Sequence, residues 1–207
     1  MEKCSLCETR RPRRNCPALG KDICAQCCGS KREVTVDCPL DCAYLIEGRD
    51  HEQLVSVGEY PNRDVEVSES FLERNKPLYI FVLGTLHQTA NENPAVIDAD
   101  MREAIAALVQ KYRAKQSALV VEPALPNPIA AAVLNSFEQK MEEFREKVIS
   151  ENVDPAVFID DNMFKVMVFL DRFAAVKNNG RPKGRHFLSL LRFMFPPTEP
   201  KAALVAG

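Results

Sequence analysis

Residues 4–42 read CSLCETRRPRRNCPALGKDICAQCCGSKREVTVDCPLDC, and they contain all eight cysteines of the 207-residue chain. Residues 43–207 contain none. Thiols that serve as small apolar fillers would be spread over every core element, so packing alone does not explain this segregation. It indicates a metal-bound module joined to a conventional folded domain.

The overall composition is typical of a globular protein, with 46% apolar and 27% charged residues. A net charge of −2 offers no general attraction to nucleic acid or to an anionic membrane. The N-terminus is cysteine-rich and basic, so we expect no signal peptide. The longest apolar runs, 78–86 and 166–170, are shorter than the ~20 residues of a membrane span. We expect a cytoplasmic protein, in which thiols stay reduced and favour metal over disulfides.

Two Cys-x-x-Cys pairs, Cys4/Cys7 and Cys24/Cys27, stand in the module. A two-residue gap lets both thiolates of a tight turn point at one ion. Gly29 follows the second pair, and we expect it to take a positive φ.

The second half of the module has its own local signals. Arg32–Val36 alternates polar and β-branched residues, which predicts a short strand. Cys38-Pro39-Leu40-Asp41-Cys42 predicts the start of a helix, with Pro39 in its first turn and both sulfurs on one face. Asp37 is the expected cap.

The cysteine pair in a tight turn, the short strand and the helix that carries ligands together resemble a treble-clef or cross-brace zinc finger. This is the broad kind that includes the HIT, B-box and MYND fingers. The resemblance covers residues 1–51 and concerns spacing only. The isolated Cys16 and the adjacent Cys27-Cys28 depart from the spacings of those families.

Eight thiols suffice for two tetrahedral four-cysteine zinc sites. Because neighbouring side chains diverge, we assign Cys27 and Cys28 to different ions. One set is then Cys4, Cys7, Cys24 and Cys27, and the other is Cys16, Cys28, Cys38 and Cys42, with His51 as a reserve ligand. A single ion, an iron–sulfur cluster and plain thiols or disulfides are the alternatives.

Four thiolates leave no open position on zinc, so we expect structural ions and no hydrolytic chemistry. The module has few large apolar residues, and metal binding would supply the missing folding free energy, about 10 kcal/mol per site in zinc-finger peptides.

Two basic clusters are candidate anion-binding sites. The first comprises Arg10, Arg11, Arg13 and Arg14, with Lys21, Lys31 and Arg32 nearby; the second is the loop with Arg181, Lys183 and Arg185. Clustered guanidinium groups favour phosphates. Solvated loops, whose charge offsets that of the thiolates, are the alternative.

We expect a small metal-stabilised α+β zinc-finger module at 1–59, a linker at 60–67, an all-α helical bundle at 68–197 and a disordered tail at 198–207. Within the bundle, a capping box at Ser70–Glu73 predicts a short helix. Further helices are expected over 78–91, from Asp98, over 128–150, over 160–176 and over 185–195, with a turn at Asp154-Pro155. A strand is the alternative for Tyr79–Leu83, and Ser117–Glu122 is expected to be extended.

No catalytic motif is present in the sequence, and we expect no enzyme. His87 is expected in the core, and Asp98, Asp100, Asp160 and Asp161 are expected as helix caps or loop charges. The sequence favours a zinc-binding adaptor or regulatory protein with a protein partner. A nucleic-acid-binding regulator that uses both basic clusters is the alternative, and a thiol redox sensor is a more distant one. Oligomeric state stays open.

Overall fold

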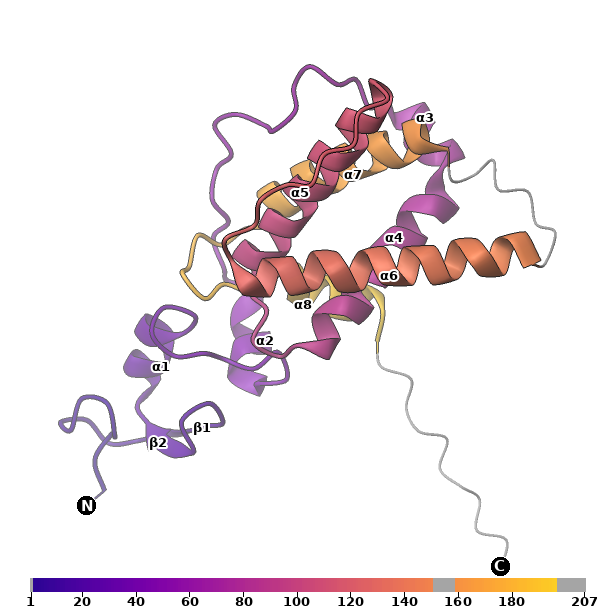
Figure 1. Ribbon diagram of the computed structural model, residues 1–207. Coiled ribbons are helices and arrows are strands. Elements are labelled where there is room, and N and C mark those ends of the chain that lie inside the picture. Colours follow the sequence, from indigo (N-terminus) through magenta and orange to yellow (C-terminus); the bar gives the residue numbers. More distant parts are fainter. Residues whose placement is uncertain (1, 151–158, 197–207) are drawn as a thin grey trace, which may run out of the picture.

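The computed structural model describes residues 2–150 and 159–196. A small N-terminal module with two strands precedes a mostly helical region, and the module lies at one end of the helices (Figure 1). At this level the predicted fold class is confirmed. The expected turn at Asp154-Pro155 and the expected tail at 198–207 lie outside the described residues.

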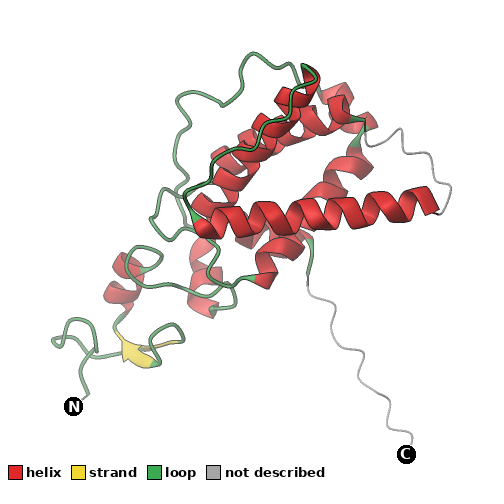
Figure 2. Cartoon of the chain, in the orientation of Figure 1, coloured by secondary structure: helices red, strands yellow, loops and turns green. Residues whose placement is uncertain are grey.

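The first regular elements of the module form a β-hairpin that local signals did not predict. Strand β1 (Arg14–Cys16) pairs antiparallel with β2 (Lys21–Ile23), with Arg14 opposite Ile23 (Figure 2). Gly20 takes a φ of +60° in the connecting turn, a conformation that glycine adopts without steric cost.

Helix α1 (Ala25–Lys31) follows the hairpin directly and begins at the second Cys-x-x-Cys pair. Cys24 is its N-cap residue, and its sulfur accepts the N–H of Cys27. Gly29 lies inside this helix and has no positive φ, so the positive φ predicted for it is wrong.

The expected strand at Arg32–Val36 is also wrong. The carbonyl of Lys31 accepts the N–H groups of Val34, Thr35 and Val36, and Glu33 has a φ of +51°. This segment is therefore a tight turn, with only one isolated bridge between Arg32 and Val36.

The helix predicted at Cys38 begins later than expected. Helix α2 spans Ala43–Arg49, with Cys42 as its N-cap residue, and Cys38 lies in the loop before it. Asp37 contacts Arg185 instead of capping this helix.

The segment that links module and bundle packs on the helices. Helix α7 (Asp160–Val176) contributes Arg172, whose guanidinium donates to the carbonyls of Pro61, Asn62 and Val65. The predicted linker at 60–67 is thus held against the helical region by hydrogen bonds.

Helix α3 (Glu69–Arg74) is capped by Ser68, whose hydroxyl accepts the N–H of Phe71, and not by the predicted Ser70. Helix α4 (Lys76–Glu92) begins almost at once with Pro77 in its first turn, which suits its fixed φ. The strand alternative at Tyr79–Leu83 is wrong, because these residues are helical.

Three long helices begin where sequence predicted. Helix α5 spans Asp98–Gln116, α6 spans Pro128–Ser150, and α7 begins at Asp160. At the start of α6 the side-chain oxygen of Asn127 accepts the N–H groups of Ile129 and Ala130. Helix α8 (His186–Met194) closes the described chain, and residues 117–127 form an irregular segment.

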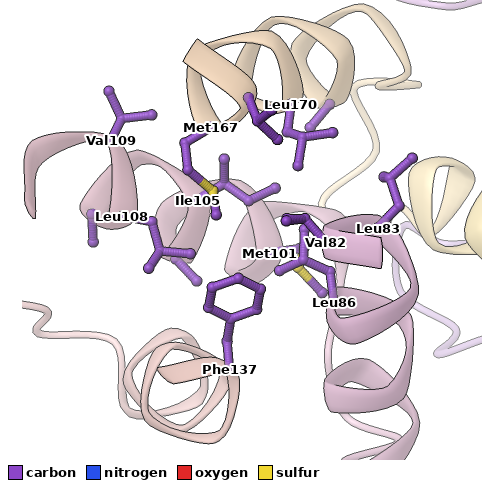
Figure 3. Packing of buried hydrophobic residues seen from close by; sticks show 14 of the residues in the cluster. Val82, Leu83, Leu86, Met101, Ile105, Leu108, Val109, Phe137, Met167 and Leu170 are labelled. Atoms are coloured by element: carbon purple, nitrogen blue, oxygen red, sulfur yellow. The ribbon is translucent and has the colours of Figure 1, made fainter. Parts of the chain in front are cut away.

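The hydrophobic core lies where α4, α5, α6 and α7 meet (Figure 3). Helix α5 contacts both α6 and α7, and α4 contacts α6 and α8. The buried side chains at the centre are Val82, Leu86, Met101, Ile105, Leu108, Phe137, Met167 and Leu170. No helix in the described part of the chain has the length and apolar character needed to cross a membrane.

Candidate metal centre

The first predicted ligand set comes together in space. The Sγ atoms of Cys4, Cys7, Cys24 and Cys27 all lie within 4.8 Å of one another. Cys4 and Cys7 lie in the loop before β1, while Cys24 and Cys27 cap and begin α1, so the hairpin brings the two pairs together. All but Cys7 are buried. This cluster could hold a metal ion.

Backbone donors favour thiolates within the cluster. The N–H of Cys24 donates to the Cys4 sulfur at 3.1 Å, and the N–H of Cys27 donates to the Cys24 sulfur at 3.4 Å. The hydroxyl of Thr9 lowers the pKa of Cys7 to about 5, with help from the N–H of Arg10. Arg10 interacts with the Cys24 sulfur, which raises the pKa of that arginine.

One member of the cluster resists ionisation. The hydrogen bond between Cys27 and Cys24, together with burial, raises the pKa of Cys27 to about 12. Four adjacent thiolates would repel one another, so the cluster retains a proton unless a cation replaces it. A bound metal ion would displace this proton, and its affinity would rise with pH.

The four cysteines of the second predicted ligand set line a different part of the module. Cys16 ends β1, Cys28 lies in α1, Cys38 lies in the following loop and Cys42 precedes α2; all four line one small hollow of about 10 Å³. The four sulfurs are less tightly grouped than those of the first set. The Nη1 atom of Arg14 donates to the Cys28 sulfur at 3.3 Å.

The predicted basic residues lie in different surroundings. Arg10, Arg11 and Arg13 are exposed. Arg14 and Arg181 line one open hollow of about 560 Å³, together with Arg32, Glu47, Glu52 and the reserve ligand His51. His51 is exposed there and is not among the residues that line the smaller cysteine-lined hollow.

Arg185 occupies an interior position, in contrast to the exposed loop expected from sequence. It is 3% exposed, and its guanidinium donates to the carbonyls of Val96 and Cys38 and contacts Asp37. Lys183 donates its backbone N–H to the carbonyl of Glu33. These two residues therefore connect the α7–α8 loop to the module; anion binding by the exposed members stays a prediction.

Sequence reasoning missed the polar network that joins module and helical region. The Glu33 carboxylate is fully buried and accepts two hydrogen bonds from Arg49, at 2.6 and 3.0 Å. It also accepts from Asn179 Nδ2 at 2.8 Å and from the N–H of Arg185 at 2.9 Å. Glu52 contacts the same Arg49 at 2.5 Å.

The network extends to a histidine. The Nδ1 atom of His186 lies 2.8 Å from Glu52, and Asn179 donates to the same carboxylate. Burial opposes ionisation of Glu52, but His186 and Arg49 outweigh it and lower the pKa of Glu52 to about 2. The only local signal of this network is the i, i+3 spacing of Arg49 and Glu52 on and just after α2.

The remaining candidates have structural partners. His87 is buried, pairs with Asn91 at 2.9 Å and stacks on Phe195. Asp98 accepts the N–H groups of Phe187 and Leu188 at the start of α8.

The other predicted carboxylates are similarly engaged. Asp100 accepts the N–H of Ile97, Asp160 pairs with Lys115 and Asp161 pairs with Lys165.

Comparison with models of known protein families, with curated proteins and with solved structures gave no match. We therefore infer a function from the residues of this chain alone.

Proposed function

We propose that this chain is a zinc-binding adaptor or regulatory protein whose metal centre is structural and whose helical region binds a protein partner. The observation that carries the proposal is the four-cysteine cluster, three of whose members are buried, in a module joined to the helices. Four thiolates satisfy the tetrahedral preference of zinc and leave no position for a reactive water.

The local arrangement around the cluster supports zinc and the resemblance to a treble clef. A cysteine pair in a loop, a β-hairpin and a helix that begins at the second pair follow one another in the chain. The same proposal includes a second zinc ion, held by Cys16, Cys28, Cys38 and Cys42.

An exposed apolar segment supports a protein-binding role for the helical region. Leu119, Val120 and Val121 are consecutive, and their exposed fractions are 59%, 91% and 41%. Lys111 and Glu122 flank them as an ion pair. Contiguous apolar side chains with a charged rim are typical of contact surfaces for other proteins.

Nucleic-acid binding is the second candidate, because Arg14, Arg32 and Arg181 line the same open hollow. Glu47 and Glu52 line it too, and the net charge of the chain is −2. These carboxylates would repel a phosphate backbone, which places this candidate behind the adaptor.

The test is capture of interacting proteins on the zinc-loaded full chain, in parallel with Val120→Asp. A partner that the wild type retains and the variant loses, at equal zinc content, supports the adaptor. Phe193→Asp, at an exposed apolar position on α8 and outside this segment, is the matched control and should retain the partner.

Binding to mixed-sequence DNA that falls steeply with salt would contradict the adaptor. Its loss in an Arg14→Ala, Arg181→Ala double variant would assign the binding to the open hollow. Zinc release by peroxide that reverses on reduction would instead favour the thiol redox sensor.

A further inference from the structure

The turn that follows α1 carries most of the contacts between the module and the α7–α8 loop. Glu33 receives the N–H of Arg185 on its carboxylate and the N–H of Lys183 on its carbonyl, at 2.9 and 2.8 Å. Arg181 donates to the carbonyl of Arg32 at 2.5 Å, and Arg185 donates to the carbonyl of Cys38 at 3.1 Å. We call residues 32–38 the docking turn.

The docking turn lies between two members of the second cysteine set. Cys28 precedes it in α1, Cys38 is its last residue, and Cys42 follows one short turn later. The N–H of Glu33 interacts with the Cys38 sulfur. The hollow lined by this set is thus formed in part by the same backbone that presents Glu33 to the helices.

Charge and space at this hollow suit a thiolate-bound cation. Three of the four cysteines are buried, and the hollow has room for about one small ion. Arg14 already donates to the Cys28 sulfur, and it lies over the Tyr44 ring. Four thiolates around one divalent ion carry a net negative charge. The positive guanidinium of Arg14 would offset part of this charge.

An ion at this hollow would also change the shape of the turn. Zn–S bonds are about 2.3 Å long, which places tetrahedral sulfurs about 3.8 Å apart. Among the described residues, only the first set has its four sulfurs within 4.8 Å of one another. Binding would therefore bring the four sulfurs closer together, and it would hold the chain at Cys28 before the docking turn and at Cys38 at its end.

We propose that Cys16, Cys28, Cys38 and Cys42 form a second zinc site whose ion fixes the docking turn and thereby couples the module to the helical region. The first site orders the hairpin and has no such role. This inference rests on the second ion of the proposed function and adds a division of labour between the two ions.

The test uses the full chain with Cys16→Ser and with Cys7→Ser as its matched control. Cys16 lies on the hairpin and outside the docking turn, so serine at this position changes no residue of the turn itself. Zinc content is measured together with amide hydrogen exchange at Lys183 and Arg185, whose N–H groups donate to Glu33.

We expect two zinc ions in the wild type and one in each variant. Exchange at the two amides should rise at least about tenfold in Cys16→Ser and stay unchanged in Cys7→Ser. Circular dichroism should show the same helix content in all three proteins. Cys42→Ser is the second variant and should repeat the result of Cys16→Ser.

The possible failures are distinguishable. One zinc ion in the wild type would overturn the second site and leave the first site and the adaptor standing. Loss of one ion from Cys16→Ser without faster exchange would overturn the coupling alone. Equal acceleration in both variants, or loss of helix content in both second-site variants, would overturn the division of labour.

Discussion

Replacement of Glu33 by alanine should be the most destabilising change at the junction between module and helices. The carboxylate is fully buried and accepts four hydrogen bonds, from Arg49, Asn179 and the N–H of Arg185. Its removal leaves the charge of Arg49, whose side chain is 13% exposed, with Glu52 as its remaining carboxylate partner.

Removal of one partner of a buried ion pair costs about 3–5 kcal/mol, chiefly because the other charge stays buried. Glu52 still contacts Arg49, so we expect the lower end, about 3 kcal/mol. Asn179 and the N–H of Arg185 also lose an acceptor, and each buried donor left unpaired adds about 1 kcal/mol or more. We therefore expect Glu33→Ala to lower the free energy of unfolding by about 5 kcal/mol.

The assay is urea unfolding of the zinc-loaded chain, monitored by the circular dichroism signal of its helices. Glu47→Ala on the exposed face of α2 is the control, and it should change the free energy by less than about 0.5 kcal/mol. If Glu33→Ala unfolds at the same urea concentration as Glu47→Ala, the buried network contributes nothing and the reasoning is refuted.

Three further changes test other parts of the fold. The pKa of Glu52 lies at about 2, below its ordinary 4.5; the unfolded chain therefore binds more protons in this range, and the free energy of unfolding should fall by up to about 3 kcal/mol as pH drops from about 5 to 2. Urea titrations at several pH values should show this loss in the wild type and not in Glu52→Gln. Phe137→Ala should cost about 3–5 kcal/mol, because it empties a fully buried position between α6 and its neighbours; a loss under 1 kcal/mol would mean that this core is loosely packed. Asn127→Ala should cost about 1–2 kcal/mol, because the side-chain oxygen caps α6 and its Nδ2 donates to Asp100 and Glu103; Asn127→Ser restores the cap alone and should recover part of the loss, and equal loss in both variants would contradict the capping role.

Local signals predicted the first residue of a helix well where the sequence contains a capping residue. Asn127-Pro128 starts α6 as expected, since both the amide cap and the proline act within one turn. The starts at Asp98 and Asp160 were also predicted from neighbouring residues. Such signals need no knowledge of the rest of the fold.

The errors fall where distant contacts override local preference. Arg32–Val36 has the alternation of a strand, but Glu33 turns inward because Arg49 and Asn179 bind its carboxylate. The hairpin at 14–23 was missed because its strands are short and largely polar, and Gly20 was the one local signal for it.

In the candidate site too, local signals predicted some features, and contacts between distant residues determined the others. The spacing of the cysteines and the divergence of Cys27 and Cys28 sufficed to predict the first set, which the structure brings together. Sequence could not predict the burial of Arg185, because its partners come from Val96, Cys38 and Asp37, each far away in the chain.

Native mass spectrometry of the freshly purified full chain, under reducing conditions, tests the central claim most directly. We expect two zinc ions per chain, with one ion lost from Cys7→Ser and one from Cys16→Ser. A metal-free chain whose residues 4–49 remain protected from hydrogen exchange, with all thiols reduced, would contradict it.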